Sequence, residues 1–148
     1  MLSIRDFTLR HEDIRRMVID AEDVACVHPA HSAEHALLVL IKSGYSAIPV
    51  VASDGKVVGT ISKTLILDKI LGLERIEFEA LSTYTVADAM NPEVARIASD
   101  QSFMRALQLS IDWPFLCVEN DEGIFTGLMT RRGILALIHH EIQRENRD

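Results

Sequence analysis

Two adjacent arginines, Arg131 and Arg132, stand where the sequence predicts the start of a helix. The positive end of a helix dipole disfavours cations, so two guanidinium groups at this place carry a local electrostatic cost. A bound anion would remove that cost and would also meet the free backbone N–H groups of the first turn. In the alternative interpretation, both arginines are solvated and their stems cover apolar surface. The pair alone leaves both interpretations open.

The segments on either side of the arginines must position them. Residues 124–129 are apolar, with one glycine and no proline, which predicts a strand. Residues 132–143 predict a helix, because apolar side chains recur on one face: Ile134, Leu137, Ile138 and Ile142. Thr130 lies between the two segments and is predicted to cap the helix.

The composition indicates an ordinary folded protein. The chain has 148 residues, of which 48% are hydrophobic and 25% charged, and its net charge of −7 argues against DNA or RNA as partners. The charged N-terminus and the lack of a long apolar run predict neither a signal peptide nor a membrane span, so the expected location is cytoplasmic. Cys26 and Cys117 fall in apolar runs, and we expect two buried free thiols.

From residue 24 the chain repeats itself. Ser32 matches Ser102 with an offset of 70 residues, and Gly59 matches Gly127 with an offset of 68. Each copy predicts the order β-α-β-β-α, with Ser32 or Ser102 near the start of its first helix. The predicted strands cover residues 24–27, 47–51 and 57–61 in the first copy and 95–97, 115–118 and 124–129 in the second. The predicted apolar stripe of the first helix is Ala33, Ala36, Leu37, Leu40 and Ile41.

Each copy has about 60 residues, which is near the lower limit for a stable lone domain, so the two copies should pack as a pseudo-two-fold pair. The predicted fold class is therefore α/β (α+β). The predicted divisions are an N-terminal arm at 1–17, repeats at 18–71 and 86–143, a partly helical linker at 72–85 and a tail at 144–148.

This duplication resembles the CBS domain pair, or Bateman module. The resemblance is carried by Gly-Tyr-Ser-Ala-Ile-Pro-Val-Val at 44–51 and Asp-Gly-Lys-Val-Val-Gly-Thr-Ile-Ser at 54–62, and it covers roughly residues 12–143. Residues 34–40, 72–79, 117–122 and 130–132 are most similar to the small stand-alone CBS proteins of Gram-positive bacteria that bind cyclic di-AMP.

The resemblance implies an adenosyl ligand in a cleft between the two halves. Carried onto this chain, it assigns to that cleft Asp23, Val24, Ala25, Cys26, Tyr45, Ser46, Ala47, Pro49, Thr130, Arg131 and Arg132. Arg131 and Arg132 would hold phosphate, since each guanidinium can form forked hydrogen bonds and two of them suit a ligand with two phosphates. Backbone groups of Ala25 and Ala47 would contact the adenine edge, with Tyr45 or Ser46 on the wall. Plain core packing remains the alternative for Ala25 and Ala47.

Two departures from the family pattern affect this expectation. Leu65 and Gly133 stand where many CBS motifs have an aspartate that holds the ribose, so recognition would depend on phosphate and base, and Gly133 would leave room for a bulky ligand. The pseudo-symmetric cleft is expected to be weaker. Its residues would be Ala95, Arg96, Pro114, Phe115, Ser62, Lys63 and Thr64.

The implied function is a non-catalytic sensor of cyclic di-AMP that forms a homodimer and regulates a partner protein, such as a (p)ppGpp synthetase/hydrolase or pyruvate carboxylase. The alternatives are a sensor of AMP, ADP, ATP or S-adenosylmethionine, and a ligand-free dimeric adaptor whose arginines pair with acidic residues of a neighbour. No catalytic motif or cofactor site is predicted. A metal site at His28, His31 and His35 is disfavoured against a solvated cluster at a helix start.

Overall fold

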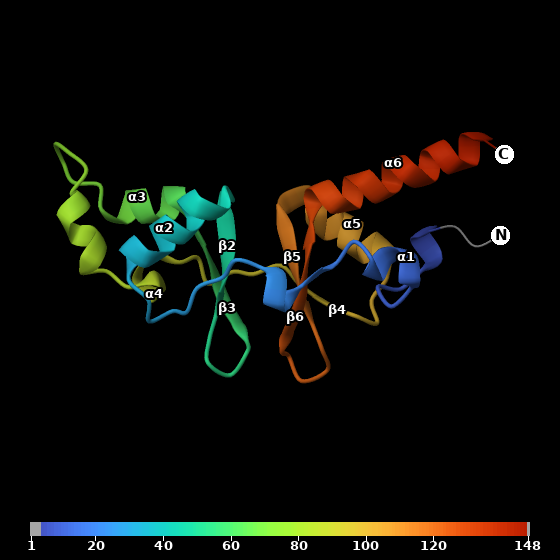
Figure 1. The fold of residues 1–148 in the computed structure, drawn as a ribbon, viewed down its shortest axis with the longest axis horizontal. Helices are drawn as coiled ribbons and strands as arrows, with labels where there is room; N and C mark the ends of the chain where they lie inside the picture. Colours follow the sequence, from blue (N-terminus) through green and yellow to red (C-terminus); the bar gives the residue numbers. More distant parts are fainter. Residues whose placement is uncertain (1–3, 148) are drawn as a thin grey trace. The chain divides into compact units, whose positions relative to one another are not determined.

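The computed structural model describes residues 4–147 and divides into two compact units. Unit 1 combines the residues up to Val24 with those from Ala95 on, and unit 2 runs from Ala25 to Val94. Both helices and strands are present in each unit, as the predicted fold class requires (Figure 1). None of the helices between residues 4 and 147 has the length and apolar character needed to cross a bilayer.

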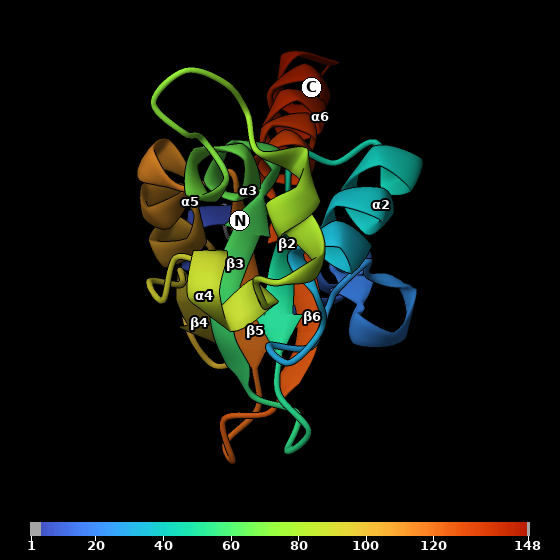
Figure 2. The ribbon, with the colours of Figure 1, turned by 90° about the vertical axis from the view of Figure 1, so that its left-hand side faces the viewer.

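Unit 2 is built around an antiparallel hairpin of β2 (Ala47–Val51) and β3 (Val57–Ser62), in which Ile48 pairs with Ile61. Its helices are α2 (Ala33–Ser43), α3 (Lys63–Lys69) and the short α4 (Val86–Ala89), with a 3-10 helix, η3, at Phe78–Ser82. Helices α2 and α3 contact each other and β3, and Figure 2 shows α2 beside the hairpin and α3 near its upper end. The buried cluster beneath them includes Leu40, Ile48 and Ile66.

The residue types at both ends of helix α2 explain where it begins and ends. The Ser32 hydroxyl accepts a hydrogen bond from the His35 backbone N–H at 3.1 Å, which caps the first turn. At the other end Gly44 adopts φ 77°, a left-handed conformation that glycine takes without steric cost, and its N–H donates to the Leu40 carbonyl. These two ends deliver the chain into the turn before β2.

Unit 1 contains a four-stranded sheet in the order β1-β6-β5-β4. The strands are β1 (Ile19–Asp20), β4 (Arg96–Ala98), β5 (Phe115–Glu119) and β6 (Phe125–Thr130); β4 and β5 are parallel, and the other pairs are antiparallel. The helices are α1 (Glu12–Arg15), α5 (Phe103–Asp112) and α6 (Arg131–Arg147), with 3-10 helices η1 (Ile4–Asp6) and η2 (Ala21–Asp23). Leu9, Ile14, Phe103 and Met129 lie in its buried cluster.

Each unit receives one segment from a distant part of the chain in the same way. In unit 1, Leu9 N–H donates to the Gln101 carbonyl at 3.0 Å; in unit 2, Val86 N–H donates to the His31 carbonyl at 2.8 Å. His31 and Gln101 are equivalent positions of the repeat, 70 residues apart. The segment that precedes one repeat therefore completes the sheet and helix layer of the other. The predicted boundaries follow the sequence repeat, whereas the structural units exchange these segments.

Several local predictions need correction. Residues 24–27 do not form a strand; Val27 alone makes a parallel bridge, to Val50, after η2. Ile41 and Ile142 are exposed rather than part of an apolar helix face, and Cys26 is exposed whereas Cys117 is buried. Helix α6 runs from Arg131 to Arg147, beyond the predicted residues 132–143.

Candidate ligand-binding site

The start of α6 satisfies most of its own backbone donors. The Thr130 hydroxyl accepts a hydrogen bond from the Gly133 N–H at 2.9 Å, which confirms the predicted cap. The Arg131 N–H donates to the Pro114 carbonyl at 2.9 Å. Among residues 4–147, these two bonds leave the Arg132 N–H as the first-turn donor without an acceptor. An anion at this helix end would therefore meet one free amide, fewer than the sequence predicts.

Arg131 is held by the preceding helix. Its Nε donates to the Ser110 carbonyl at 2.7 Å, and one Nη lies 3.4 Å from the Ile111 carbonyl. These carbonyls belong to the last turn of α5, where the helix dipole favours a cation. The negative end of α5 thus compensates for the arginine at the positive end of α6. A guanidinium has five N–H donors, so those not used by α5 stay available in a fixed orientation.

Arg132 has no such compensation. Its side chain is exposed, and it has no hydrogen-bond or ion-pair partner among the described residues. The electrostatic cost of a cation at a helix start therefore falls on Arg132, with Arg131 as its anchored neighbour.

The space beside Gly133 is filled by protein. A Cβ on this glycine would lie 3.1 Å from Thr130 Oγ1 and 3.2 Å from Met17 Cε. Met17 precedes β1 and packs against the buried cluster of unit 1. Gly133 thus permits close packing at the start of α6. This packing explains the glycine without the expected room for a ligand.

The other residues assigned to the site fall into both units. In unit 1, Asp23 ends η2, which packs against β6, the strand that leads to Thr130. Asp23 is exposed and Val24 half-buried. Unit 2 holds the remaining six assigned residues, namely Ala25, Cys26, Tyr45, Ser46, Ala47 and Pro49.

Residues 44–49 show two kinds of surface. Tyr45 and Ser46 are exposed in the turn after α2, so their side chains are available to a ligand. Ala47 is half-buried at the start of β2, and Pro49 is buried, with its carbonyl accepting the Val27 N–H at 3.2 Å. Pro49 thus has a structural task in the pairing of β2 with Val27.

Two residues of the predicted weaker site are engaged in local structure. The Ser62 hydroxyl caps α3 by accepting the Leu65 N–H at 3.1 Å. Arg96 forms an ion pair with Glu119. The Ser62 hydroxyl and the Arg96 guanidinium are thus engaged in local contacts, whereas a second ligand would require them as hydrogen-bond partners.

The three histidines form a local cluster at the entry to α2. His28 Nδ1 accepts the Ala30 N–H and His31 Nδ1 accepts the His28 N–H, both at 3.0 Å. The rings of His31 and His35 meet edge to face at 4.4 Å. Desolvation lowers the pKa of His31, and the neighbouring His35 and His28 lower it further. Within residues 4–147 no group of three or more His, Cys, Asp or Glu side chains has an arrangement suited to a metal ion.

Comparison with known proteins gives matches along almost the whole chain. A family model described as CBS domain matches residues 12–72. Cyclic di-AMP receptor B of Bacillus subtilis (strain 168) is 38% identical over 147 residues, which cover 99% of this chain and 100% of that protein.

Solved structures agree in fold. A CBS domain-containing protein of unknown function from Bacillus anthracis aligns with a TM-score of 0.83 and 44% identity, over 93% of this chain and 96% of that chain. The CbpB protein of Listeria monocytogenes in complex with c-di-AMP aligns with a TM-score of 0.81 and 40% identity, over 89% and 98% of the two chains.

Proposed function

Because the chain belongs to the family of CBS-domain proteins, we propose that it is a non-catalytic receptor for cyclic di-AMP in which Arg132 is the principal phosphate ligand. The observation that carries the proposal is the full-length similarity to a protein named cyclic di-AMP receptor B, combined with an exposed guanidinium at a helix start that no described residue of unit 1 compensates. The CbpB structure of Listeria monocytogenes in complex with c-di-AMP supports the same ligand.

Six of the eleven assigned residues have distinct parts in this proposal. Arg132 contributes its guanidinium and its backbone N–H to a phosphate, while Arg131, oriented by Ser110 and Ile111, offers its remaining donors to the other phosphate. Tyr45 and Ser46 provide exposed ring and hydroxyl surface. Ala25 and Ala47 bring backbone groups close to the base because their side chains are small.

Regulation of a partner follows as the second part of the proposal. A ligand shifts a conformational equilibrium only by its differential affinity for the two states. Ordering of Arg132, Tyr45 and Ser46 by the ligand would change an exposed surface that a partner protein can sense. A homodimer, with a (p)ppGpp synthetase/hydrolase or pyruvate carboxylase as the regulated enzyme, remains the partner prediction.

Isothermal titration calorimetry tests the ligand. Cyclic di-AMP should bind more tightly than AMP, ATP and S-adenosylmethionine, each measured under the same salt conditions. Arg132→Met should weaken cyclic di-AMP binding roughly 10- to 100-fold, the cost of losing a charge-assisted hydrogen bond. The control is Arg105→Met, which removes an exposed arginine of α5 that bonds to Gln108. Unchanged affinity in Arg132→Met, with the fold intact by circular dichroism, would contradict the site.

A ligand-free adaptor predicts a different result. Its arginines would serve an interface, so Arg132→Met would change the mass measured by light scattering and no nucleotide would bind. The bonds of Arg131 to α5 disfavour this alternative, since they engage one of the two arginines within its own unit.

A further inference from the structure

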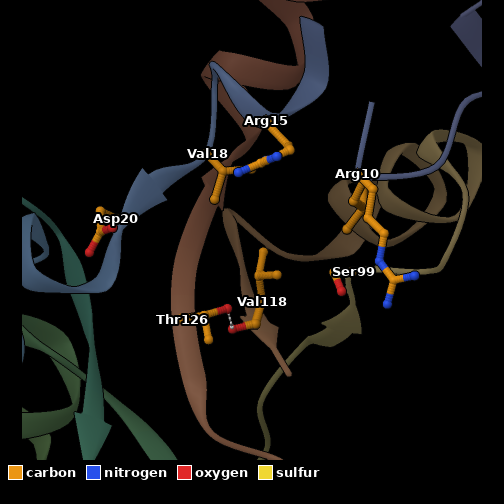
Figure 3. A pocket seen from close by; sticks show the side chains of 8 residues that line it. Arg10, Arg15, Val18, Asp20, Ser99, Val118 and Thr126 are labelled. Carbon is orange, nitrogen blue, oxygen red and sulfur yellow. Dashed lines mark hydrogen bonds between the residues drawn. The ribbon is translucent and has the colours of Figure 1, made fainter. Parts of the chain in front are cut away.

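Unit 1 contains a pocket of about 510 Å³ that shares no residue with the proposed cyclic di-AMP site. Its apolar lining is formed by Leu9, Val18 and Val118, of which Leu9 and Val118 are buried. Val118 lies near the end of β5, and Val18 immediately precedes β1. The pocket is thus set at the junction where the N-terminal segment joins the sheet (Figure 3).

Two arginines border this pocket without partners. Arg10 and Arg15 are exposed, and neither side chain has a hydrogen bond or ion pair with any residue between 4 and 147. The adjacent Arg16, which does not line the pocket, pairs with Glu12 at 2.6 Å. Figure 3 shows the Arg15 side chain directed towards Val18 and the Arg10 side chain beside Ser99. In a chain with net charge −7, two pocket-lining guanidiniums that form no ion pair with residues 4–147 leave positive charge for a ligand.

Polar side chains complete the lining. Figure 3 shows Arg10 and Ser99 on one side of the pocket and Asp20 on the other, with Val118 and Thr126 between them. The Thr126 hydroxyl donates to the Val118 carbonyl at 3.3 Å, so it can still accept a hydrogen bond. One oxygen of Asp20 accepts the Glu22 N–H at 3.0 Å, and its carboxylate would repel a second anionic group at that side.

The corresponding positions of unit 2 show that the fold does not impose this chemistry. Ser99 corresponds to Pro29 in the repeat, and Thr126 to Val58. Arg10 follows Leu9, which binds Gln101 as Val86 binds His31, so its counterpart is Ala87. Unit 2 thus has a proline, a valine and an alanine where unit 1 has two hydroxyls and an arginine.

We propose that this pocket is a second ligand site for a small molecule with one phosphate group and an apolar body. Arg10 would hold the phosphate through forked hydrogen bonds with the Ser99 hydroxyl beside it, and Arg15 would add positive charge from the Val18 side of the pocket. The apolar body would lie on Leu9, Val18 and Val118. Asp20 selects against a polyanion and favours a far end that is neutral or donates a hydrogen bond.

The test uses phenyl phosphate as the probe, in a titration of the full chain followed by amide nuclear magnetic resonance. Saturable shifts should appear at Ser99, Val118 and Thr126. The double variant Arg10→Gln/Arg15→Gln should lose these shifts, and the matched control Arg16→Gln should keep them with an affinity within twofold of the original chain. Benzoate, with a single negative charge, should bind at least roughly tenfold more weakly than the phosphate dianion.

The possible outcomes separate this site from the proposed cyclic di-AMP site. Loss of phenyl phosphate binding in Arg10→Gln/Arg15→Gln, with cyclic di-AMP affinity retained, supports a second site whether or not cyclic di-AMP is the true first ligand. Shifts that persist in the double variant, or no saturable shift at the three amides, overturn the proposal. Binding of an Asp- and Glu-rich peptide in place of phenyl phosphate also overturns it, in favour of a protein partner.

Discussion

Arg131 Nε donates a 2.7 Å hydrogen bond to the carbonyl oxygen of Ser110, and this bond joins the start of α6 to the end of α5. Two arginines that are adjacent in sequence therefore differ in their contacts. Arg131 is bonded to α5, whereas the Arg132 side chain is exposed and has no partner among residues 4–147.

The first prediction concerns this division. Arg131→Met should lower the free energy of unfolding by about 1 kcal/mol, the usual net value of one such hydrogen bond, whereas Arg132→Met should leave it nearly unchanged. Urea denaturation monitored by circular dichroism measures both variants. Equal stability of the two variants would show that the bond to Ser110 contributes nothing in solution.

The second prediction concerns two glycines at equivalent positions of the repeat. A Cβ on Gly59 would lie 2.7 Å from the Asn91 carbonyl oxygen, and one on Gly127 would lie 2.6 Å from Val18 Cγ1. Gly59→Ala and Gly127→Ala should each destabilise the protein by about 1–3 kcal/mol, because the exchanged segment must move. Thermal unfolding measures the effect, with the exposed Thr64→Ala as the control. A neutral result at either glycine would contradict the close packing at that position.

The third prediction concerns thiol reactivity. Desolvation raises the pKa of Cys117 to about 12, with a smaller lowering by Arg96 and a smaller raising by Glu119. Partial burial also raises the pKa of Cys26, but Cys26 is exposed to the reagent whereas Cys117 is buried. At pH 8, Ellman's reagent should react with one thiol per chain in the native protein, because the thiolate is the reactive form. After denaturation it should react with two thiols per chain. Cys26→Ser should abolish the rapid reaction, and Cys117→Ser should preserve it. Rapid reaction of both thiols in the native state would refute the burial of Cys117.

The fourth prediction concerns acid. Because the pKa of His31 is lower in the folded protein than its ordinary value of 6.5, the unfolded state binds more protons just below neutrality. The stabilisation from neutral His31 is present above pH 6.5 and is lost as the pH falls through the folded pKa. Protonation of Nδ1 would also remove the acceptor of the His28 N–H.

His31→Asn tests this prediction, since the amide oxygen can accept a hydrogen bond but does not titrate. The melting temperature of the variant should fall less between pH 7 and pH 5 than that of the original chain. His140→Gln, a change at an exposed residue of α6, serves as the control and should follow the original chain. Parallel curves for His31→Asn and the original chain would exclude His31 as the titrating group.

The features that sequence could predict are those set by local chemistry. Ser32, Ser102 and Thr130 each accept a first-turn N–H, as their residue type and position before an apolar run indicate. The strand–turn–strand hairpins followed from apolar runs separated by Asp-Gly and Glu-Gly turns, and both are present.

The failures arose from long-range contacts. Residues 24–27 are apolar, yet they follow directly after η2, and of these residues only Val27 bridges to a strand, at Val50. The exchange of segments between units cannot be inferred from periodicity, although the matching Gly59 and Gly127 were a signal that a backbone crosses closely there. The bonds of Arg131 to α5 and the pocket beside Arg10 and Arg15 likewise depend on residues far apart in sequence.

The interleaving of segments has a consequence for biosynthesis. Unit 2 is a continuous stretch, so all of its contacts are available once residue 94 has left the ribosome. Unit 1 needs β6, which is made last but for α6, before β1 has a strand to join. Leu9 and Ile14 cannot be buried in unit 1 until the intervening residues have been synthesised. Apolar surface that stays exposed during synthesis is prone to aggregation and is a target for chaperones. A ribosome stalled only after residue 94 has emerged would thus carry one unit with all its residues outside and one unsatisfied N-terminal segment.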